Sequence, residues 1–173
     1  EVLAPPMGDL AHPDVSERRH LARLRSVGVT EIGLADLAER LTGTQRSSTW
    51  WRDLYVALSP LVTTAADAEE LGALPIPRSD GRVSVGARGL FLADGIDTPL
   101  RWVPTVDAQA RHPLLERLGA TTLTVSDALA DPALRQLIDH GDDDELAVVA
   151  GEVLALLAAD PPATVPEWLA ALP

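Results

Sequence analysis

The sequence predicts an α+β protein built from repeated helical modules with a small antiparallel β-meander. Two observations support this class. First, the segment Leu24–Asp36 returns in register as Leu115–Asp127, so that Gly119 follows Gly28 by 91 residues. Second, the helical spacing of apolar residues gives way to strand-like runs over residues 74–103 and then returns. A repeated supersecondary unit determines the architecture, so the repeat predicts modules of one kind.

The repeat divides the chain into two predicted domains. Residues 1–104 would form a first module of helices and meander, and residues 105–173 the helical part of a second, truncated module. The tripeptide Ala171-Leu-Pro173 repeats Ala73-Leu-Pro75, which opens the strand-like region of the first module. We therefore expect the chain to be a piece of a longer protein.

Apolar periodicity and capping residues predict the helices of the first module, in the order 14–27, 34–41, 50–58 and 64–72. Gly28 follows the first of them, where a left-handed residue ends many helices. The third helix places four apolar residues on one face: Trp51, Leu54, Tyr55 and Leu58. Thr64 and Asp67 form a capping box at the start of the fourth.

Four strand-like runs follow, namely Leu74–Pro77, Arg82–Val85, Gly89–Leu92 and Leu100–Val103. The dipeptide Asp80-Gly81 lies between the first two runs and predicts a hairpin. Pro75 and Pro77 favour an edge position for the first run, because proline has no N–H to donate to a sheet. These signals predict an antiparallel meander of three or four strands.

The second module is predicted to be helical over Leu114–Leu118, Ala133–Ile138, Asp142–Ala159 and Trp168–Leu172. Asp131 and Pro132 are a typical N-cap and first-turn pair for the second of these helices. The third is the longest and is apolar around most of its circumference. We therefore expect it to be the most buried element.

Composition excludes several kinds of chemistry. The sequence has no Cys, Lys or Asn, which excludes thiolate nucleophiles, zinc–cysteine sites, a Walker lysine and a pyridoxal Schiff base. The formal net charge of −12 disfavours binding to nucleic acids or anionic membranes. The most apolar run, Leu146–Ala159, is too short to span a bilayer. A cytoplasmic location is the expectation.

The motifs that suggest chemistry have simpler structural explanations. His140-Gly-Asp-Asp-Asp144 lacks the ligand spacing of a calcium loop and suits the start of a helix, where carboxylates favour the positive end of the dipole. No serine is placed near a histidine in a triad arrangement. No catalytic, cofactor-binding or metal-binding residue is therefore predicted. Trp50 lies off the apolar stripe of its helix, so Trp50 and the nearby Arg46 are the predicted partner-binding residues.

Several motifs together resemble the region that follows the ATPase domain in sacsin-like bacterial proteins. These motifs are Trp50-Trp-Arg-Asp-Leu-Tyr55, Leu74-Pro-Ile-Pro77 with Asp80-Gly-Arg82, and Gly89-Leu-Phe-Leu-Ala-Asp94. In that family a GHKL-type nucleotide-binding domain, related to the ninety-kilodalton heat-shock chaperones, precedes repeated α+β modules. None of the family's ATP-binding residues can be carried over, because this sequence has neither an Asn-bearing helix nor an Asp-x-Gly-x-Gly segment.

The resemblance implies a non-catalytic module of a larger, chaperone-like ATP-binding protein. Such a module would pack against other domains of the parent chain or bind protein clients, and it would need no cofactor. Two alternatives remain open. One is a small-molecule or metal-dependent enzyme with a site between the meander and the helices, which a polar pocket with converging carboxylates would favour. The other is a general protein-interaction adaptor, which an exposed apolar groove near Trp50 would favour.

Overall fold

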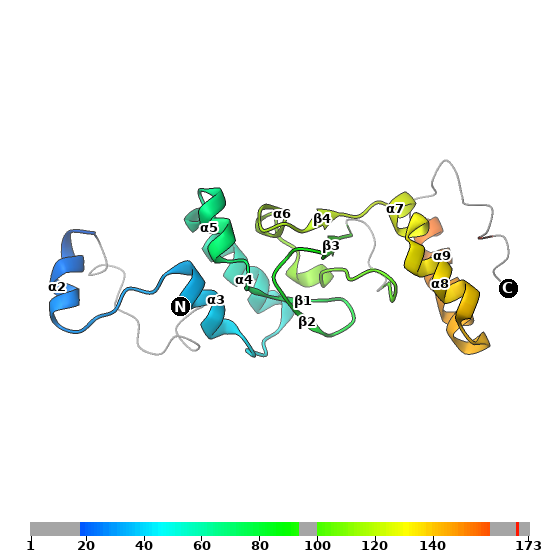
Figure 1. Cartoon of the computed structure of the whole chain (residues 1–173), viewed down its shortest axis with the longest axis horizontal. Coiled ribbons are helices and arrows are strands. Elements are labelled where there is room, and N and C mark those ends of the chain that lie inside the picture. The colour runs from blue at the N-terminus through cyan, green and yellow to red at the C-terminus, as the bar shows by residue number, and fades with distance from the viewer. Residues whose placement is uncertain (1–17, 94–99, 160–168, 170–173) are drawn as a thin grey trace.

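The computed structural model describes residues 18–93, 100–159 and 169. The described residues form short helices with four short strands between them (Figure 1). In chain order the elements are η2 (Arg18–His20), α2 (Leu21–Ser26), α3 (Leu34–Leu41), α4 (Ser48–Leu58), η3 (Ser59–Leu61), α5 (Ala65–Glu70), β1 (Pro75–Pro77), β2 (Val83–Val85), β3 (Phe91–Leu92), η4 (Ala108–Ala110), α6 (Leu114–Arg117), β4 (Thr121–Thr122), α7 (Val125–Ala130), α8 (Pro132–His140) and α9 (Asp143–Ala159). The α+β class predicted from the sequence is confirmed.

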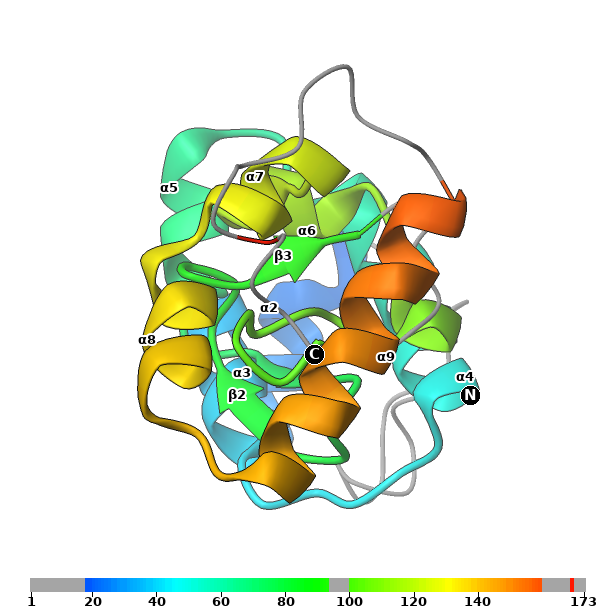
Figure 2. The same ribbon diagram turned by 90° about the vertical axis from the view of Figure 1, so that its right-hand side faces the viewer.

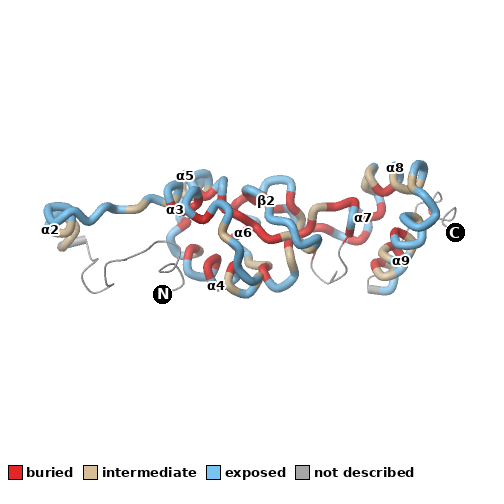
Figure 3. The backbone as a smooth tube through the Cα atoms, turned by 90° about the horizontal axis from the view of Figure 1, so that it is seen from below, coloured by how far each residue is buried: buried red, intermediate tan, exposed pale blue. Residues whose placement is uncertain are grey.

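The elements are spread along one long axis. Helix α2 lies at one end, the strands lie in the middle, and α7, α8 and α9 lie at the other end (Figure 1). The view along that axis has α8 and α9 facing the viewer (Figure 2). Buried backbone is concentrated in the middle of the molecule, whereas α2 is largely exposed (Figure 3).

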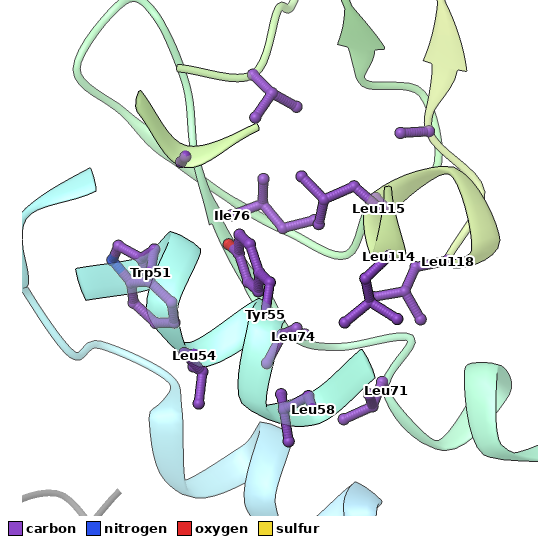
Figure 4. Packing of buried hydrophobic residues seen from close by; sticks show 14 of the residues in the cluster. Trp51, Leu54, Tyr55, Leu58, Leu71, Leu74, Ile76, Leu114, Leu115 and Leu118 are labelled. Carbon is purple, nitrogen blue, oxygen red and sulfur yellow. The ribbon is translucent and has the colours of Figure 1, made fainter. Parts of the chain in front are cut away.

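A first hydrophobic cluster fills the middle of the molecule. It joins the inner faces of α3 and α4 to β1 and α6. The stripe predicted for α4 is buried in it, and Trp51 is only 1% exposed. Leu114, Leu115 and Leu118, from α6 and its C-terminal end, enter the same cluster, where Leu115 lies beside Ile76 (Figure 4).

A second cluster lies at the far end and joins α7, α8 and α9. It also takes in a turn that precedes η4, at Leu100, Trp102 and Val103. The indole Nε1 of Trp102 donates to the carbonyl of Ala128 at 2.9 Å. Ala93 and the turn at Leu100–Val103 therefore contribute to the second cluster, whereas buried residues from Leu37 to Leu92 and from Val106 to Ala120 contribute to the first. The two predicted domains, 1–104 and 105–173, stay a prediction.

The predicted hairpin is present. β1 pairs antiparallel with β2, and Pro75 lies opposite Val85. Gly81 in the intervening turn has a φ of 78°. This left-handed conformation suits glycine, as the Asp80-Gly81 signal requires.

The remaining predicted strands differ from the structure. β3 does not continue a meander but pairs in parallel with β4, so that Phe91 lies opposite Thr121. The prediction of a strand at Leu100–Val103 is wrong, because these residues form a turn. The backbone N–H and the Nε of Arg101 both donate to the Glu152 carboxylate on α9, each at 3.1 Å. This long-range anchoring and the burial of Trp102 hold the segment outside any sheet.

The two copies of the internal repeat share one backbone motif. The N–H of Gly28 donates to the carbonyl of Arg25 at 3.1 Å, and that of Val29 to Leu24 at 3.0 Å. The same two bonds recur 91 residues later, from Gly119 to Glu116 at 3.0 Å and from Ala120 to Leu115 at 2.9 Å. This pair of bonds is the Schellman end of a helix. Gly28 and Gly119 both have positive φ, 88° and 106°, as the motif needs.

The register continues into the next helix of each copy. α3 and α7 begin at Leu34 and Val125, which are repeat equivalents. The third residue of each helix, Asp36 or Asp127, accepts a bond from the N–H of the N-cap residue, at 3.3 and 3.4 Å. The predicted equivalence of the two segments is thus confirmed at the level of local structure. Apolar periodicity and capping residues did not predict the helix α7.

Side-chain caps determine several other helix starts as predicted. Asp131 accepts from the N–H of Ala133 at 2.8 Å at the start of α8. At α5, the Asp67 carboxylate accepts from the N–H groups of Thr63 and Thr64, and these bonds lower its pKa to about 2. The predicted helix at 168–172 lies outside the described residues, apart from Leu169.

The expectation that α9 is the most buried element is wrong. Its inner face, Val149, Val153 and Leu156, packs in the second cluster. Its outer face leaves Val148 and Leu154 exposed, the latter by 66%. The all-round apolar character of this helix therefore does not correspond to burial on every side.

Candidate functional site

The predicted partner-binding residues lie at the first turn of α4. Ser47 caps this helix, and its Oγ accepts from the N–H of Trp50 at 3.3 Å. Trp50 is half-buried and Trp51 is buried, as predicted from their positions on the helix. The guanidinium carbon of Arg46 lies 5.8 Å from the centre of the Trp50 ring, within the range of a cation–π contact. The structure therefore brings the two predicted residues together.

Packing of the inner aromatic rings fixes the orientation of Trp50. Its ring meets that of Trp51 edge to face, with centroids 4.9 Å apart. Trp51 in turn lies 6.3 Å from Tyr55, whose hydroxyl donates to the carbonyl of Pro75 at 3.0 Å. Burial raises the pKa of Tyr55, which keeps this donor protonated. Trp50 therefore packs against Trp51, which packs against Tyr55, and Tyr55 is hydrogen-bonded to β1.

A cavity of about 360 Å³ opens beside Trp51, between the start of α4 and the turn of the β1–β2 hairpin. We call it the arginine groove after three of the residues that define it, Arg46, Arg78 and Arg82. Ser48, Trp51 and Asp107 also line it.

The groove carries positive charge in an otherwise acidic chain. Asp107 is engaged in a cap, because its Oδ1 accepts from the N–H of Gln109 at 2.8 Å. Asp80 of the hairpin turn pairs with Arg78 at 2.7 Å and lies 3.8 Å from Arg82. The Nε of Arg78 is buried and has no hydrogen-bond partner within the described residues. Arg46 and Arg82 are exposed, so the groove can present these two guanidinium groups to an additional anionic group.

The acidic stretch that suggested a metal site serves helix capping. Asp142 accepts from the N–H of Glu145 at 2.9 Å, and the His140 ring lies 3.1 Å from the carbonyl of Gln136. Over residues 18–93, 100–159 and 169, no three histidine, aspartate or glutamate side chains converge as metal ligands would. Asp142 thus caps the first turn of α9.

A second cavity, of about 480 Å³, lies between α5, β2 and α6, where the enzyme alternative would place a site. Among the described residues its lining has one carboxylate, Glu69, and one guanidinium, Arg88. This arrangement lacks the converging carboxylates that would favour the enzyme alternative.

The sequence predicts Trp50 and Arg46 as partner-binding residues and gives no role to Arg78 and Arg82, which also line the groove. These two residues flank the Asp80-Gly81 turn, and the hairpin fold was the only signal there. Their convergence with α4 depends on β1 packing against that helix, which local pattern does not show.

No protein-family model, curated protein or solved structure matches this chain. Among the helices of the described residues, none has the length and apolar character needed to cross a membrane. The assignment of a function therefore depends on the geometry of the groove and on the resemblance of the sequence motifs.

Proposed function

We propose that this chain is a non-catalytic module of a larger, chaperone-like ATP-binding protein of the cytoplasm, and that it binds protein partners through the arginine groove and the adjacent Trp50. The parent protein is proposed on the resemblance of the Trp50–Tyr55 and hairpin motifs to sacsin-like proteins. The binding role is proposed on the groove.

The observation that carries the binding role is the juxtaposition of three guanidinium groups with a fixed, half-exposed indole. Arg and Trp are enriched at the energetic centres of protein interfaces. Guanidinium groups bind carboxylates in a bidentate manner, and the indole ring adds apolar contact beside them. The groove therefore suits an acidic segment of a partner, with an apolar side chain placed against Trp50.

The test uses a fluorescein-labelled peptide of alternating glutamate and leucine, titrated with the protein and followed by fluorescence anisotropy. A peptide with glutamine in place of glutamate is the ligand control. The double variant Arg46→Gln and Arg82→Gln is expected to weaken binding about 2- to 30-fold, because each exposed charge pair is worth about 0.2–1 kcal/mol.

Arg40→Gln provides the matched protein control, since Arg40 is an exposed arginine of α3 outside the groove. It is expected to bind like the wild type. Equal binding of the glutamate and glutamine peptides, or equal loss in the Arg40→Gln control, would exclude the groove as the binding surface.

A further inference from the structure

The two copies of the repeat have the same local structure but different surroundings. In the second copy, Leu115 and Leu118 are buried in the first cluster, and Leu118 is only 6% exposed. Their equivalents in the first copy, Leu24 and Val27, are not buried, and Val27 is 74% exposed. Helix α2 therefore presents an apolar face that the equivalent helix α6 buries.

The second copy shows what such a face packs against. η4 and α6 both contact α4, the longest helix of the first cluster. Leu114 and Leu118 are buried in the same cluster as Leu58 of that helix (Figure 4). η2 and α2 have the same order as η4 and α6, a 3-10 turn followed by a short helix with a Schellman end. The natural partner of η2–α2 is therefore a long helix of another module of this kind.

Helix α9 is such a helix and has an uncovered side. It is the longest helix of the second cluster, as α4 is of the first. Its outer face is exposed and apolar, at Ala147, Val148, Gly151 and Leu154. A Cβ built on Gly151 would meet no atom within 4 Å, so this side of α9 is open.

The charges of the two ends are complementary. η2–α2 carries Arg19, Arg23 and Arg25 and no carboxylate, and Arg25 pairs with Glu31, which follows the helix. The start of α9 carries Asp143, Asp144 and Glu145, and Asp139 lies just before it on α8. These elements lie at opposite ends of the described molecule, so they do not meet within it (Figure 1). The contact they suit is one with a second copy.

We infer that this protein self-associates head to tail, with η2–α2 of one copy packed on the outer face of α9 of a second copy. Val27 and Leu24 would cover Val148 and Leu154, and the arginines of α2 would face the acidic start of α9. The contact joins two different surfaces, so each added copy leaves one of each free, and the assembly grows into open chains or closes into a ring. It goes beyond the proposed function, because it uses no residue of the arginine groove.

Sedimentation velocity at rising protein concentration tests this assembly. The wild type is expected to form dimers and larger species as the concentration rises. A head variant, Arg23→Glu with Val27→Ser, and a tail variant, Asp144→Arg with Leu154→Ser, are each expected to stay monomeric. An equimolar mixture of the two retains one intact contact and is expected to stop at a dimer.

Matched controls separate this contact from a general effect of surface substitution. Val56→Ser changes a residue that is 53% exposed on α4, away from both ends, and is expected to associate like the wild type. Far-UV circular dichroism verifies the fold of every variant. A monomeric wild type at all concentrations, or a mixture of head and tail variants that forms no dimer, would overturn the inference.

The absence of cysteine from the sequence permits a direct test of geometry. A Val27→Cys chain mixed with a Leu154→Cys chain is expected to form a disulfide-linked heterodimer under mild oxidation. The pair Val27→Cys and Val56→Cys is the control, and it is expected to cross-link only slowly, since a disulfide needs Cβ atoms about 3.5–4.5 Å apart. Equal cross-linking of the two pairs would also overturn the inference.

Variants of the arginine groove leave η2–α2 and α9 intact, so failure of the peptide-binding test and failure of the assembly test are distinguishable.

Discussion

At the scale of single residues, Trp50 and Trp51 have different roles although they are adjacent in the sequence. Consecutive helical residues point about 100° apart, so one faces the cluster and the other faces outward. Trp51 is fully enclosed among Leu54, Tyr55 and the rest of the first cluster. Trp50 touches the cluster from outside and is stabilised by the edge of the Trp51 ring and by Arg46.

This difference predicts unequal costs of truncation. Trp51→Ala is expected to lower the free energy of unfolding by about 3–5 kcal/mol, as for other large core aromatics. Trp50→Ala is expected to cost much less, with about 0.5–1.5 kcal/mol from its aromatic contact, and to weaken peptide binding instead. Urea unfolding of both variants measures the costs. Equal large losses would mean that Trp50 belongs to the core and does not serve binding.

At the scale of elements, the repeated helix ends offer a matched pair. Gly28 and Gly119 occupy the same position of the same motif with positive φ. A residue with a Cβ pays about 1–2 kcal/mol for this conformation. The added Cβ at Gly119 would also lie 2.9 Å from Cγ of Arg88, whereas at Gly28 it would meet nothing within 4 Å.

We therefore expect Gly119→Ala to lower the global free energy of unfolding by about 1–2 kcal/mol. Gly28→Ala is expected to leave global stability almost unchanged, because no residue of α2 is buried. Its effect appears as faster hydrogen exchange of the Val29 amide, which bonds to Leu24 at the end of that helix. Urea unfolding and amide exchange in dilute solution separate the two effects. A global loss in Gly28→Ala equal to that in Gly119→Ala would show that α2 unfolds together with the first cluster.

At the scale of the whole molecule, the proposed role requires that this chain alone does not bind ATP. Contacts to phosphate and magnesium usually come from Lys and Asn side chains and from a glycine-rich loop that leads into a helix. The sequence has none of these three features. Isothermal titration calorimetry with Mg-ATP is expected to show no binding. Micromolar affinity would contradict the non-catalytic interpretation, whatever the outcome of the peptide and assembly experiments.

Features that depend on neighbours along the chain can be predicted from the sequence. The bounds of α3, α4, α5 and α9 followed from apolar periodicity and capping residues, and the hairpin followed from Asp80-Gly81. The 91-residue register marked the shared helix ends at Gly28 and Gly119. In the candidate site, the same local logic separated Trp50 from Trp51 and picked out Arg46.

Which surfaces are covered depends on contacts between segments that are distant in the sequence. The parallel pairing of β3 with β4, the turn at Leu100–Val103 and the arrival of Arg78 and Arg82 beside α4 depend on contacts between distant segments. The helices α2 and α6 show the reason most directly. Their sequences give them the same Schellman end, because those hydrogen bonds are local. Burial of Leu115 and exposure of Val27 depend instead on whether another part of the fold lies against the helix.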